Sequence, residues 1–349
     1  MENKNIQAFK DAKYGLMMHF GLYTLLGGQY QNHRGPDYAE WIECHERISV
    51  SEMRKIATAF NPIYFDAEKI CQMALACGMK YIVVTTKHHE GFCLFDSKVD
   101  DFTVCRATPC GRDLIKELAD ACRKYGLKLG FYYSQCIDWN EKDGGGWTIP
   151  AVNCAGVSWE NSWDFPNKEE KNFDRVFYRK MLPQIEELCR NYGDIFLFWF
   201  DMPLDSTKKH STEIYELVKK YQPDCLINSR LGNGAYDYVS LGDNEIPSEI
   251  PKEVEAGGDP NDICGFKYSP YGLYESACTI NPKSWGYTTV YHTYRSPEVI
   301  CERRVKLEKL GINYLLNVAP DWLGRIPFEA EQILMDAQKL YLEHKKAEN

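Results

Sequence analysis

The sequence predicts an α/β fold, a closed (β/α)8 barrel of the TIM type, formed by one domain over residues 1–349. Short apolar runs rich in β-branched and aromatic residues alternate with helical patterns, which is typical of a parallel sheet that helices cover on both faces. Eight such runs can be found, and that number favours a closed barrel over an open sheet. The length of 349 residues also suits one barrel.

The elements follow from the position of these runs. The predicted strands are residues 14–20, 81–86, 127–133, 195–200, 225–228, 238–241, 286–291 and 312–318. The predicted helices are residues 50–60, 67–77, 112–125, 172–191, 212–220, 297–310 and 327–345. Two long segments, 144–167 and 246–271, interrupt the alternation after the third and sixth strands. Because loops at the carboxyl ends of barrel strands carry binding residues, we expect these two segments to shape specificity.

Composition excludes several classes of function. The net charge is −9 and the charges are interspersed, without the Lys/Arg block that nucleic acid or an anionic membrane would require. No apolar run approaches the length of about 18 residues that a membrane span needs. Residues 1–10 are polar and lack the apolar core of a secretory signal, so we expect a cytoplasmic location. The 14 cysteines form no CxxC pair, and we interpret them as reduced structural thiols.

Polar, ionisable and aromatic residues end six consecutive predicted strands. Those that we single out are His19, His88, His89, Tyr133, Asp201, Arg230 and the segment 242–245. A lone histidine at the end of a strand usually has a structural role. Six strands that end in this way are harder to explain, because active sites of barrels lie at this face. The set therefore predicts a catalytic pocket.

His88 and His89 raise the question of a metal. Neighbouring side chains on a strand point to opposite faces, so the two could share a metal only if the strand has already ended. Imidazole groups beside aromatic faces also suit a sugar, since hydroxyls need directional partners and the C–H face of the ring packs on aromatics. Aromatic residues make up 13% of the chain. We predict a sugar pocket without metal or cofactor, and keep a metal-dependent barrel hydrolase as an alternative.

Hydrolysis of a glycosidic bond needs two carboxyl groups that flank it. Asp201 ends the most hydrophobic predicted strand and would lie deep in the pocket. The second group should come from a neighbouring strand or its loop. Glu245 and Glu249, which follow the sixth strand, are the candidates, and the residues by themselves leave the choice between them open.

At these residues the sequence resembles the α-L-fucosidases of glycoside hydrolase family 29. The motifs that carry the resemblance are KYGLMMHFGLYT (13–24), AEWI (39–42), TTKHHEGFCLFDS (85–97), GFYYS (130–134), FWFD (198–201), NSR (228–230), SWGY (284–287) and GINYLLNVAPDWLGRIP (311–327). They run almost from end to end. The chain departs from the family at Met202, where Gly is common, and in lacking the β-sandwich that often follows the barrel.

The resemblance implies a retaining, exo-acting mechanism in which Asp201 is the nucleophile and a fucosylated oligosaccharide or glycoconjugate is the substrate. The residues that it implies around the sugar are His19, Glu40, Trp41, His88, His89, Tyr133, Arg230 and Trp285. Trp285 would pack against the methyl group or ring face of fucose. A cation such as Arg230 close to Asp201 would also keep that carboxylate ionised for attack.

The acid/base residue is less fixed by the resemblance. The pair Asn244-Glu245 is similar to the signature of the branch that prefers α-1,3/4 linkages, which favours Glu245 as acid/base and leaves Glu249 as the second choice. A non-catalytic relative that binds fucose, with the pocket kept but the acid lost, is the remaining alternative.

Overall fold

The computed structural model describes residues 3–35, 37–147, 159–250, 268–291 and 293–348. Eight strands form one sheet in the order β7-β6-β5-β4-β1-β10-β9-β8, and all neighbours are parallel. The strands are β1 (Tyr14–Met18), β4 (Tyr81–Lys87), β5 (Lys128–Ser134), β6 (Leu197–Asp201), β7 (Leu226–Ile227), β8 (Val239–Ser240), β9 (Tyr274–Thr279) and β10 (Asn313–Asn317). A parallel bridge between Asn228 and Tyr238 joins the two edges. The predicted barrel is confirmed.

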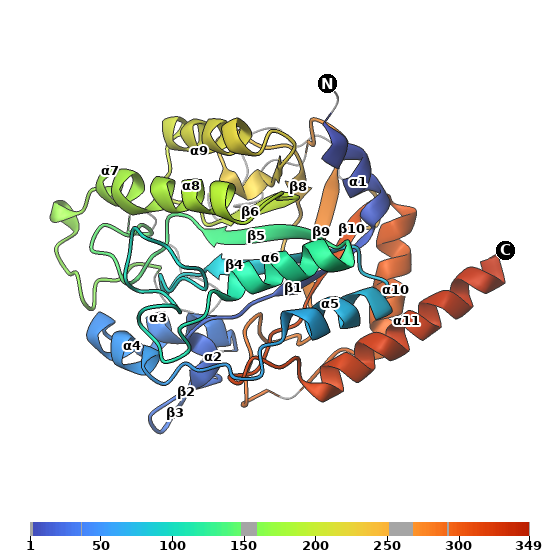
Figure 1. Cartoon of the computed structure of the whole chain (residues 1–349), viewed down its shortest axis with the longest axis horizontal. Coiled ribbons are helices and arrows are strands. Elements are labelled where there is room, and N and C mark those ends of the chain that lie inside the picture. Colours follow the sequence, from blue (N-terminus) through green and yellow to red (C-terminus); the bar gives the residue numbers. More distant parts are fainter. Residues whose placement is uncertain (1–2, 36, 148–158, 251–267, 292, 349) are drawn as a thin grey trace.

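Helices surround the sheet (Figure 1). The longer ones are α1 (Lys4–Ala12), α4 (Val50–Ala57), α5 (Ala67–Ala76), α6 (Leu114–Tyr125), α8 (Leu182–Asn191), α9 (Lys208–Tyr221), α10 (Pro297–Lys309) and α11 (Phe328–Glu348). The shorter elements are α2 (Tyr23–Leu26), the hairpin of β2 (Gln29–Tyr30) and β3 (His33–Arg34), η1 (Ala39–Trp41), α3 (Ile42–Glu46), η2 (Lys168–Glu170), α7 (Phe173–Val176), η3 (Phe177–Met181) and η4 (Ser229–Leu231).

The helices begin at residues that cap them. The side chains of Ser49, Asp66, Asp113 and Thr207 accept backbone N–H groups in the first turns of α4, α5, α6 and α9. Such caps satisfy amide groups that have no partner within the helix. The seven predicted helices match observed ones to within a few residues at each end.

Alternation along the strands separates two apolar layers. One layer fills the barrel and includes Met17, Tyr132, Trp199, Ala277 and Leu315. The other lies between the sheet and the helices and includes Leu16, Tyr133 and Phe200 among many others. Asp201 lies two residues after Trp199, so it belongs to the interior set.

One predicted strand is wrong. Residues 286–291 are not a strand, and the seventh position of the barrel is taken by β9. The sequence of β9, YESACT, has no apolar run because Glu275 and Ser276 are polar, although all six residues are buried. Local hydrophobicity therefore pointed to the wrong segment.

The two long loops of the prediction are described only in part, since residues 148–158 and 251–267 lie outside the described residues. Among the residues that are described, Trp159 and Trp163 belong to an aromatic cluster with Trp41 and Trp139 beside the barrel mouth. Within the described part of the chain, no helix is long and apolar enough to cross a membrane.

Candidate active site

Asp201 is the last residue of β6 and is buried at the carboxyl end of the barrel. The Tyr132 hydroxyl donates to Asp201 Oδ2 at 2.8 Å, and Arg230 Nη1 donates to Oδ1 at 3.3 Å. Burial raises the pKa of Asp201 above its ordinary value, and the Arg230 guanidinium opposes this shift. The following residue, Met202, has φ of +58°, a left-handed conformation that favours glycine.

Arg230 holds a second carboxylate close to Asp201. Its Nη2 donates to Asp243 Oδ1 at 2.5 Å and to the Leu241 carbonyl at 3.1 Å. The guanidinium lies 4.6 Å from the centroid of the Trp199 ring, which fixes its plane. The Asp243 side chain is 48% exposed, whereas that of Asp201 is 11% exposed. One carboxylate is therefore deep in the site and the other lies at its mouth, with one cation between them.

A third carboxylate, Glu275 of β9, forms the floor below Asp201. The Tyr81 hydroxyl donates to its Oε2 at 2.7 Å and Trp199 Nε1 donates to its Oε1 at 3.0 Å. Burial raises the pKa of Glu275 to about 7 although both donors lower it. Sequence reasoning missed this residue because it missed β9.

Histidines and aromatic rings form the wall of the site. The His19 ring lies 5.1–5.4 Å from Trp285, Tyr132 and His88, measured between centroids. On the other side, His89 lies 3.9 Å from His88 and 4.7 Å from Trp41. These six rings connect the segment after β9, which carries Trp285, to the first three strands and the loops that follow them. The structure thus brings together five of the residues expected around the sugar, namely His19, Trp41, His88, His89 and Trp285.

Two of these histidines have a defined tautomer. Asn317 Oδ1 accepts from the backbone N–H of His19 and lies 2.8 Å from its Nδ1, so Nδ1 carries the proton. Ser134 Oγ donates to the Ile137 carbonyl, so His89 Nδ1, 2.7 Å from that oxygen, is its donor. Burial lowers the pKa of His19 to about 3 and that of His89 well below its usual range. Both rings are neutral near pH 7 and offer Nε2 as an acceptor.

The neighbouring histidines lie together because β4 ends at Lys87, before either of them. The strand thus ends before both histidines, which is the condition under which they could share a metal ion. Among the described residues, however, no group of three or more His, Cys, Asp or Glu side chains is arranged to hold a metal ion. The environment of the two rings is instead aromatic.

Behind His88, Glu90 is buried and its Oε2 lies 3.5 Å from His88 Nδ1. Burial raises the pKa of Glu90 to about 8, so the folded protein binds this proton more tightly than the unfolded chain does. The contribution of Glu90 to the free energy of unfolding should therefore be greatest below the ordinary pKa of glutamate and fall as the pH rises toward 8. We expect Glu90→Gln to remove this loss, so that urea unfolding from pH 5 to 7 shows a relative gain of more than about 1 kcal/mol for the variant. Glu302→Gln, at an exposed position, is the control and should show none.

The carboxylate of Glu40 binds the segment 284–286. Its Oε2 accepts from the backbone N–H of Trp285 at 3.2 Å, the N–H of Gly286 at 2.9 Å and the Ser284 hydroxyl at 3.1 Å. Glu40 therefore holds the segment that carries Trp285. Burial raises the pKa of Glu40 to about 7, and these donors oppose the shift.

The expected position of Tyr133 is wrong. Its hydroxyl donates to Gln184 of α8 at 2.8 Å, on the outer side of the sheet, whereas the neighbouring Tyr132 contacts Asp201. Tyr132 pairs with Trp199 across β5 and β6, so these two side chains share a face. Alternation within each strand shows only that Tyr132 and Tyr133 point to opposite faces, and the register of β5 against β6 decides which of them faces Asp201.

Among the described residues, neither predicted acid, Glu245 or Glu249, forms a hydrogen bond or ion pair with Asp201. Glu245 Oε2 accepts from the backbone N–H of Gly242 at 2.8 Å, which folds the side chain back onto its own loop. Glu249 is exposed on the loop beyond it. The carboxylate that the fold brings to Arg230 is Asp243, two residues before Glu245, so the geometry favours it over both candidates.

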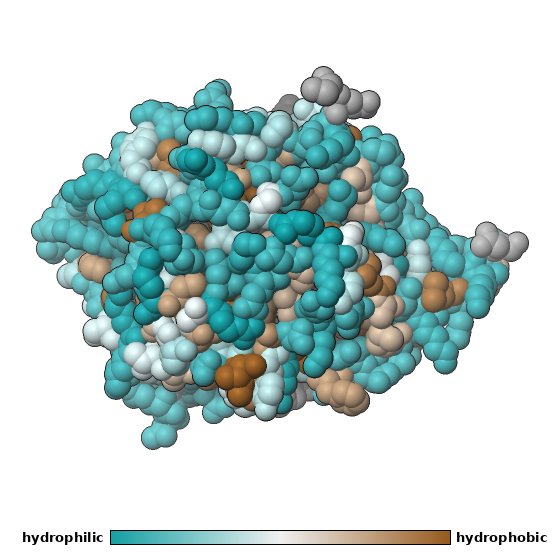
Figure 2. Space-filling view, in the orientation of Figure 1, coloured by the Kyte–Doolittle hydropathy of each residue, from teal (hydrophilic) through white to brown (hydrophobic). Residues whose placement is uncertain are grey.

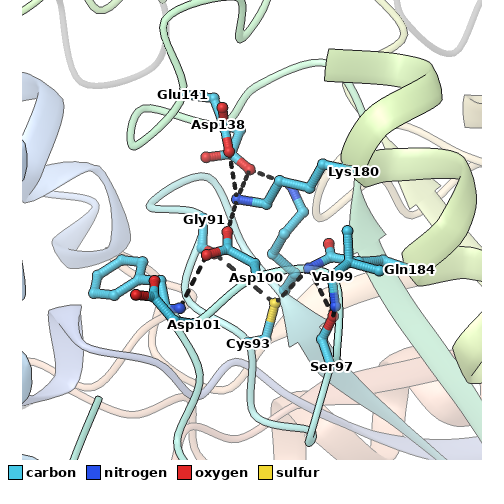
Figure 3. A network of polar contacts seen from close by, with 12 residues as sticks. Gly91, Cys93, Ser97, Val99, Asp100, Asp101, Asp138, Glu141, Lys180 and Gln184 are labelled. Atoms are coloured by element: carbon cyan, nitrogen blue, oxygen red, sulfur yellow. Dashed lines mark hydrogen bonds and ion pairs between the residues drawn. The ribbon is translucent and has the colours of Figure 1, made fainter. Parts of the chain in front are cut away.

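Lys180 lies in a buried network of ion pairs (Figure 3). Lys180 Nζ lies 2.5 Å from Asp100, 2.9 Å from Asp138 and 3.3 Å from Glu141, and Lys87 Nζ is 3.2 Å from Asp138. Although burial opposes its charge, Asp138 and the other carboxylates raise the pKa of Lys180. The π turn η3 places Lys180 there, and such turns often occur near functional sites. The network fixes Asp138, next to Trp139.

Lys180→Met is expected to lower the free energy of unfolding by about 3–5 kcal/mol, because Asp100 loses its cation and Asp138 keeps only Lys87. Urea denaturation measures this loss. Lys142→Met, which breaks the exposed pair of Lys142 with Glu170, is the matched control and should cost less than about 1 kcal/mol. Equal effects of the two changes would contradict this account of the network.

Comparison with known proteins identifies the family of this chain. Residues 1–343 match the family model described as Alpha-L-fucosidase. This chain belongs to the α-L-fucosidase family. The family comprises glycoside hydrolases, and the resemblance inferred from the sequence motifs is confirmed.

Solved members of the family have the same fold. The unliganded α-L-fucosidase AlfC from Lactobacillus casei is 50% identical, with a TM-score of 0.91, and the match covers 99% of this chain and 100% of that one. Structures of AlfC with the α-L-fucose product and of a variant with Fucα(1,6)GlcNAc match equally well. The α-L-fucosidase from Vibrio sp. strain EJY3 is 30% identical, with a TM-score of 0.83 over 99% of this chain and 56% of that one.

Mammalian members of the family are more distant. Tissue α-L-fucosidase of Mus musculus is 25% identical over 93% of this chain and 67% of its own length. Plasma α-L-fucosidase of Homo sapiens is also 25% identical, and the match covers 65% of its length. The chain thus spans about two thirds of the mammalian α-L-fucosidases that it matches.

Proposed function

We propose that this chain is a retaining, exo-acting α-L-fucosidase in which Asp201 is the nucleophile and Asp243 is the acid/base. The observation that carries the proposal is the arrangement of the two carboxylates on one guanidinium, that of Arg230, one deep and one at the mouth. Retaining glycosidases need two carboxyl groups only about 5–5.5 Å apart, one on each side of the glycosidic bond.

In the first step, ionised Asp201 attacks the anomeric carbon of fucose while protonated Asp243 gives its proton to the departing oxygen. The aglycone leaves as an alcohol and a covalent fucosyl-enzyme remains. In the second step, Asp243 takes a proton from water, whose oxygen attacks the same carbon and frees Asp201. Two inversions at one carbon give net retention.

The remaining residues bind and orient the sugar. Neutral His19 and His89 can accept hydrogen bonds from sugar hydroxyls through Nε2. Trp285 and Trp41 present aromatic faces to the apolar side of the ring. Glu275, Tyr81 and Trp199 close the floor below Asp201, and a site closed at its base admits the end of a chain, which suits removal of a terminal fucose.

For the linkage, we favour α-1,6-linked fucose on N-acetylglucosamine. A variant of AlfC, at 50% identity, has been solved with Fucα(1,6)GlcNAc. The alternative, a preference for α-1,3/4 linkages, depends on the pair Asn244-Glu245. In this structure Asn244 Oδ1 accepts from the N–H and hydroxyl of Thr279, and Glu245 accepts from Gly242. One side-chain oxygen of each residue of the pair is thus engaged by the protein itself.

Two measurements test the proposal. Proton NMR during hydrolysis of an aryl α-L-fucoside should show α-L-fucose as the first product, and β-L-fucose first would contradict retention. The values of kcat/KM for α-1,6, α-1,3 and α-1,4 disaccharides then decide the linkage. A higher value for α-1,3 or α-1,4 would replace the favoured linkage without affecting the mechanism.

A further inference from the structure

The C-terminal helix α11 has an apolar stripe on its outer face. Phe328, Met335 and Leu342 are 80%, 41% and 49% exposed. They follow each other at intervals of seven residues, almost two helical turns, so they lie along one side of the helix. The inner side is also apolar, since Ala330, Leu334 and Ala337 are buried. A helix with two apolar sides usually has two partners, and only one is supplied by the barrel.

The stripe continues onto the body of the protein. Near the start of α11, Ile63 and Tyr64 are 57% and 56% exposed. The Tyr64 N–H donates to the Leu323 carbonyl. Ile63, Tyr64 and Met335 lie along a groove between α5, α6 and α11, whose other lining residues include many charged ones such as Glu68, Lys124 and Glu331. The far end of α11 extends beyond the barrel in Figure 1, and Figure 2 shows hydrophobic surface over this helix within a mostly hydrophilic face.

The charges beside the stripe differ between its two ends. Glu331 flanks the Phe328–Met335 half, and Lys339 and Lys346 flank Leu342. If two copies of α11 lie antiparallel with their Met335 residues opposite each other, Phe328 faces Leu342 of the second copy. Glu331 then faces Lys339 of the second copy, twice by symmetry. A parallel pair would instead place like charges together, which destabilises helix pairs.

We propose that this chain forms a twofold-symmetric dimer through α11. The two helices pack antiparallel about Met335, and the protruding end of each helix covers Phe328, Ile63 and Tyr64 of the other copy. Such an isologous contact uses one patch twice, and it buries the exposed apolar side chains of both copies.

The first test is the mass in solution. Light scattering after size-exclusion chromatography should give twice the mass of the chain for the wild type and one mass for Met335→Lys, since that change places two charges opposite each other. Tyr178→Lys, at an equally exposed residue on η3, is the control and should stay dimeric. Met335 contacts Cys77 at 3.5 Å, so Phe328→Ser, at a more exposed position, provides a second monomeric variant. Both variants should keep wild-type kcat/KM on an aryl fucoside, which shows that they fold.

The second test is charge exchange. Glu331→Lys and Lys339→Glu should each weaken dimerisation about tenfold or more in Kd, and the double variant should restore it, because the charges of each pair are only swapped. A wild type that is monomeric at tens of micromolar, a dimer unchanged by Met335→Lys, or a double variant weaker than both singles would each overturn the proposal. The first result would leave the stripe for a different protein or segment.

Discussion

Asp201→Asn is expected to lower kcat on an aryl α-L-fucoside by about 10⁴-fold or more, the usual scale for loss of a covalent nucleophile. The amide keeps the size of the side chain, and its oxygen can still accept from Tyr132 or Arg230, so the pocket should stay folded. What is lost is the negative oxygen that attacks the anomeric carbon. Nitrophenol release with equal amounts of wild type and variant measures the effect.

A rescue experiment separates the loss of a nucleophile from a loss of structure. In Asp201→Ala, azide can enter the space of the carboxylate and attack the same face of the sugar. The product should then be β-L-fucosyl azide, with one inversion in place of two. A variant as active as the wild type, or an azide product with α configuration, would show that another group is the nucleophile.

Asp243→Ala is expected to give the second large effect, and Glu245→Gln almost none. Removal of a general acid costs about 10²–10⁴-fold, and the loss should be greatest for Fucα(1,6)GlcNAc, whose leaving oxygen needs a proton. For a nitrophenyl leaving group, the first step should depend less on the acid. Glu245→Gln keeps an oxygen that can accept from the Gly242 N–H, so kcat/KM should change less than about threefold.

The comparison of these variants decides which residue is the acid. Glu249→Gln, on the exposed part of the same loop, completes the set and should behave like Glu245→Gln. If Glu245→Gln or Glu249→Gln abolishes hydrolysis of the disaccharide while Asp243→Ala does not, the geometry around Arg230 does not represent the reacting state.

Arg230 contacts both Asp201 and Asp243, the two residues whose variants should lose the most activity. One guanidinium serves two carboxylates, and it is stacked on Trp199 and held by the Leu241 carbonyl. Its contact with Asp201 opposes the rise in pKa that burial causes and so favours the ionised form of the nucleophile. The nearby Asp243 acts in the other direction on Asp201. The balance between one cation and two carboxylates thus suits a site in which one group attacks while the other carries a proton.

Much of this site could be predicted from the sequence alone. Apolar runs and helical patterns are local properties, and they located seven of the eight strands and the fold class. Because the carboxyl ends of parallel strands meet at one face, the sequence assigns His19, His88, His89, Asp201 and Arg230 to one pocket. The family motifs then indicated that the sugar is fucose.

Tertiary structure decided the rest. Strand β9 is buried by its neighbours although its own sequence is polar, so no local pattern shows it or its Glu275. Tyr132 and Tyr133 differ only in the face to which each points, and the pairing of β5 with β6 determines that face. Asp243 reaches Arg230, and Glu245 does not, because the loop after β8 folds Glu245 back onto Gly242. Contacts between residues far apart in the chain depend on closure of the barrel, and a linear pattern carries no record of them.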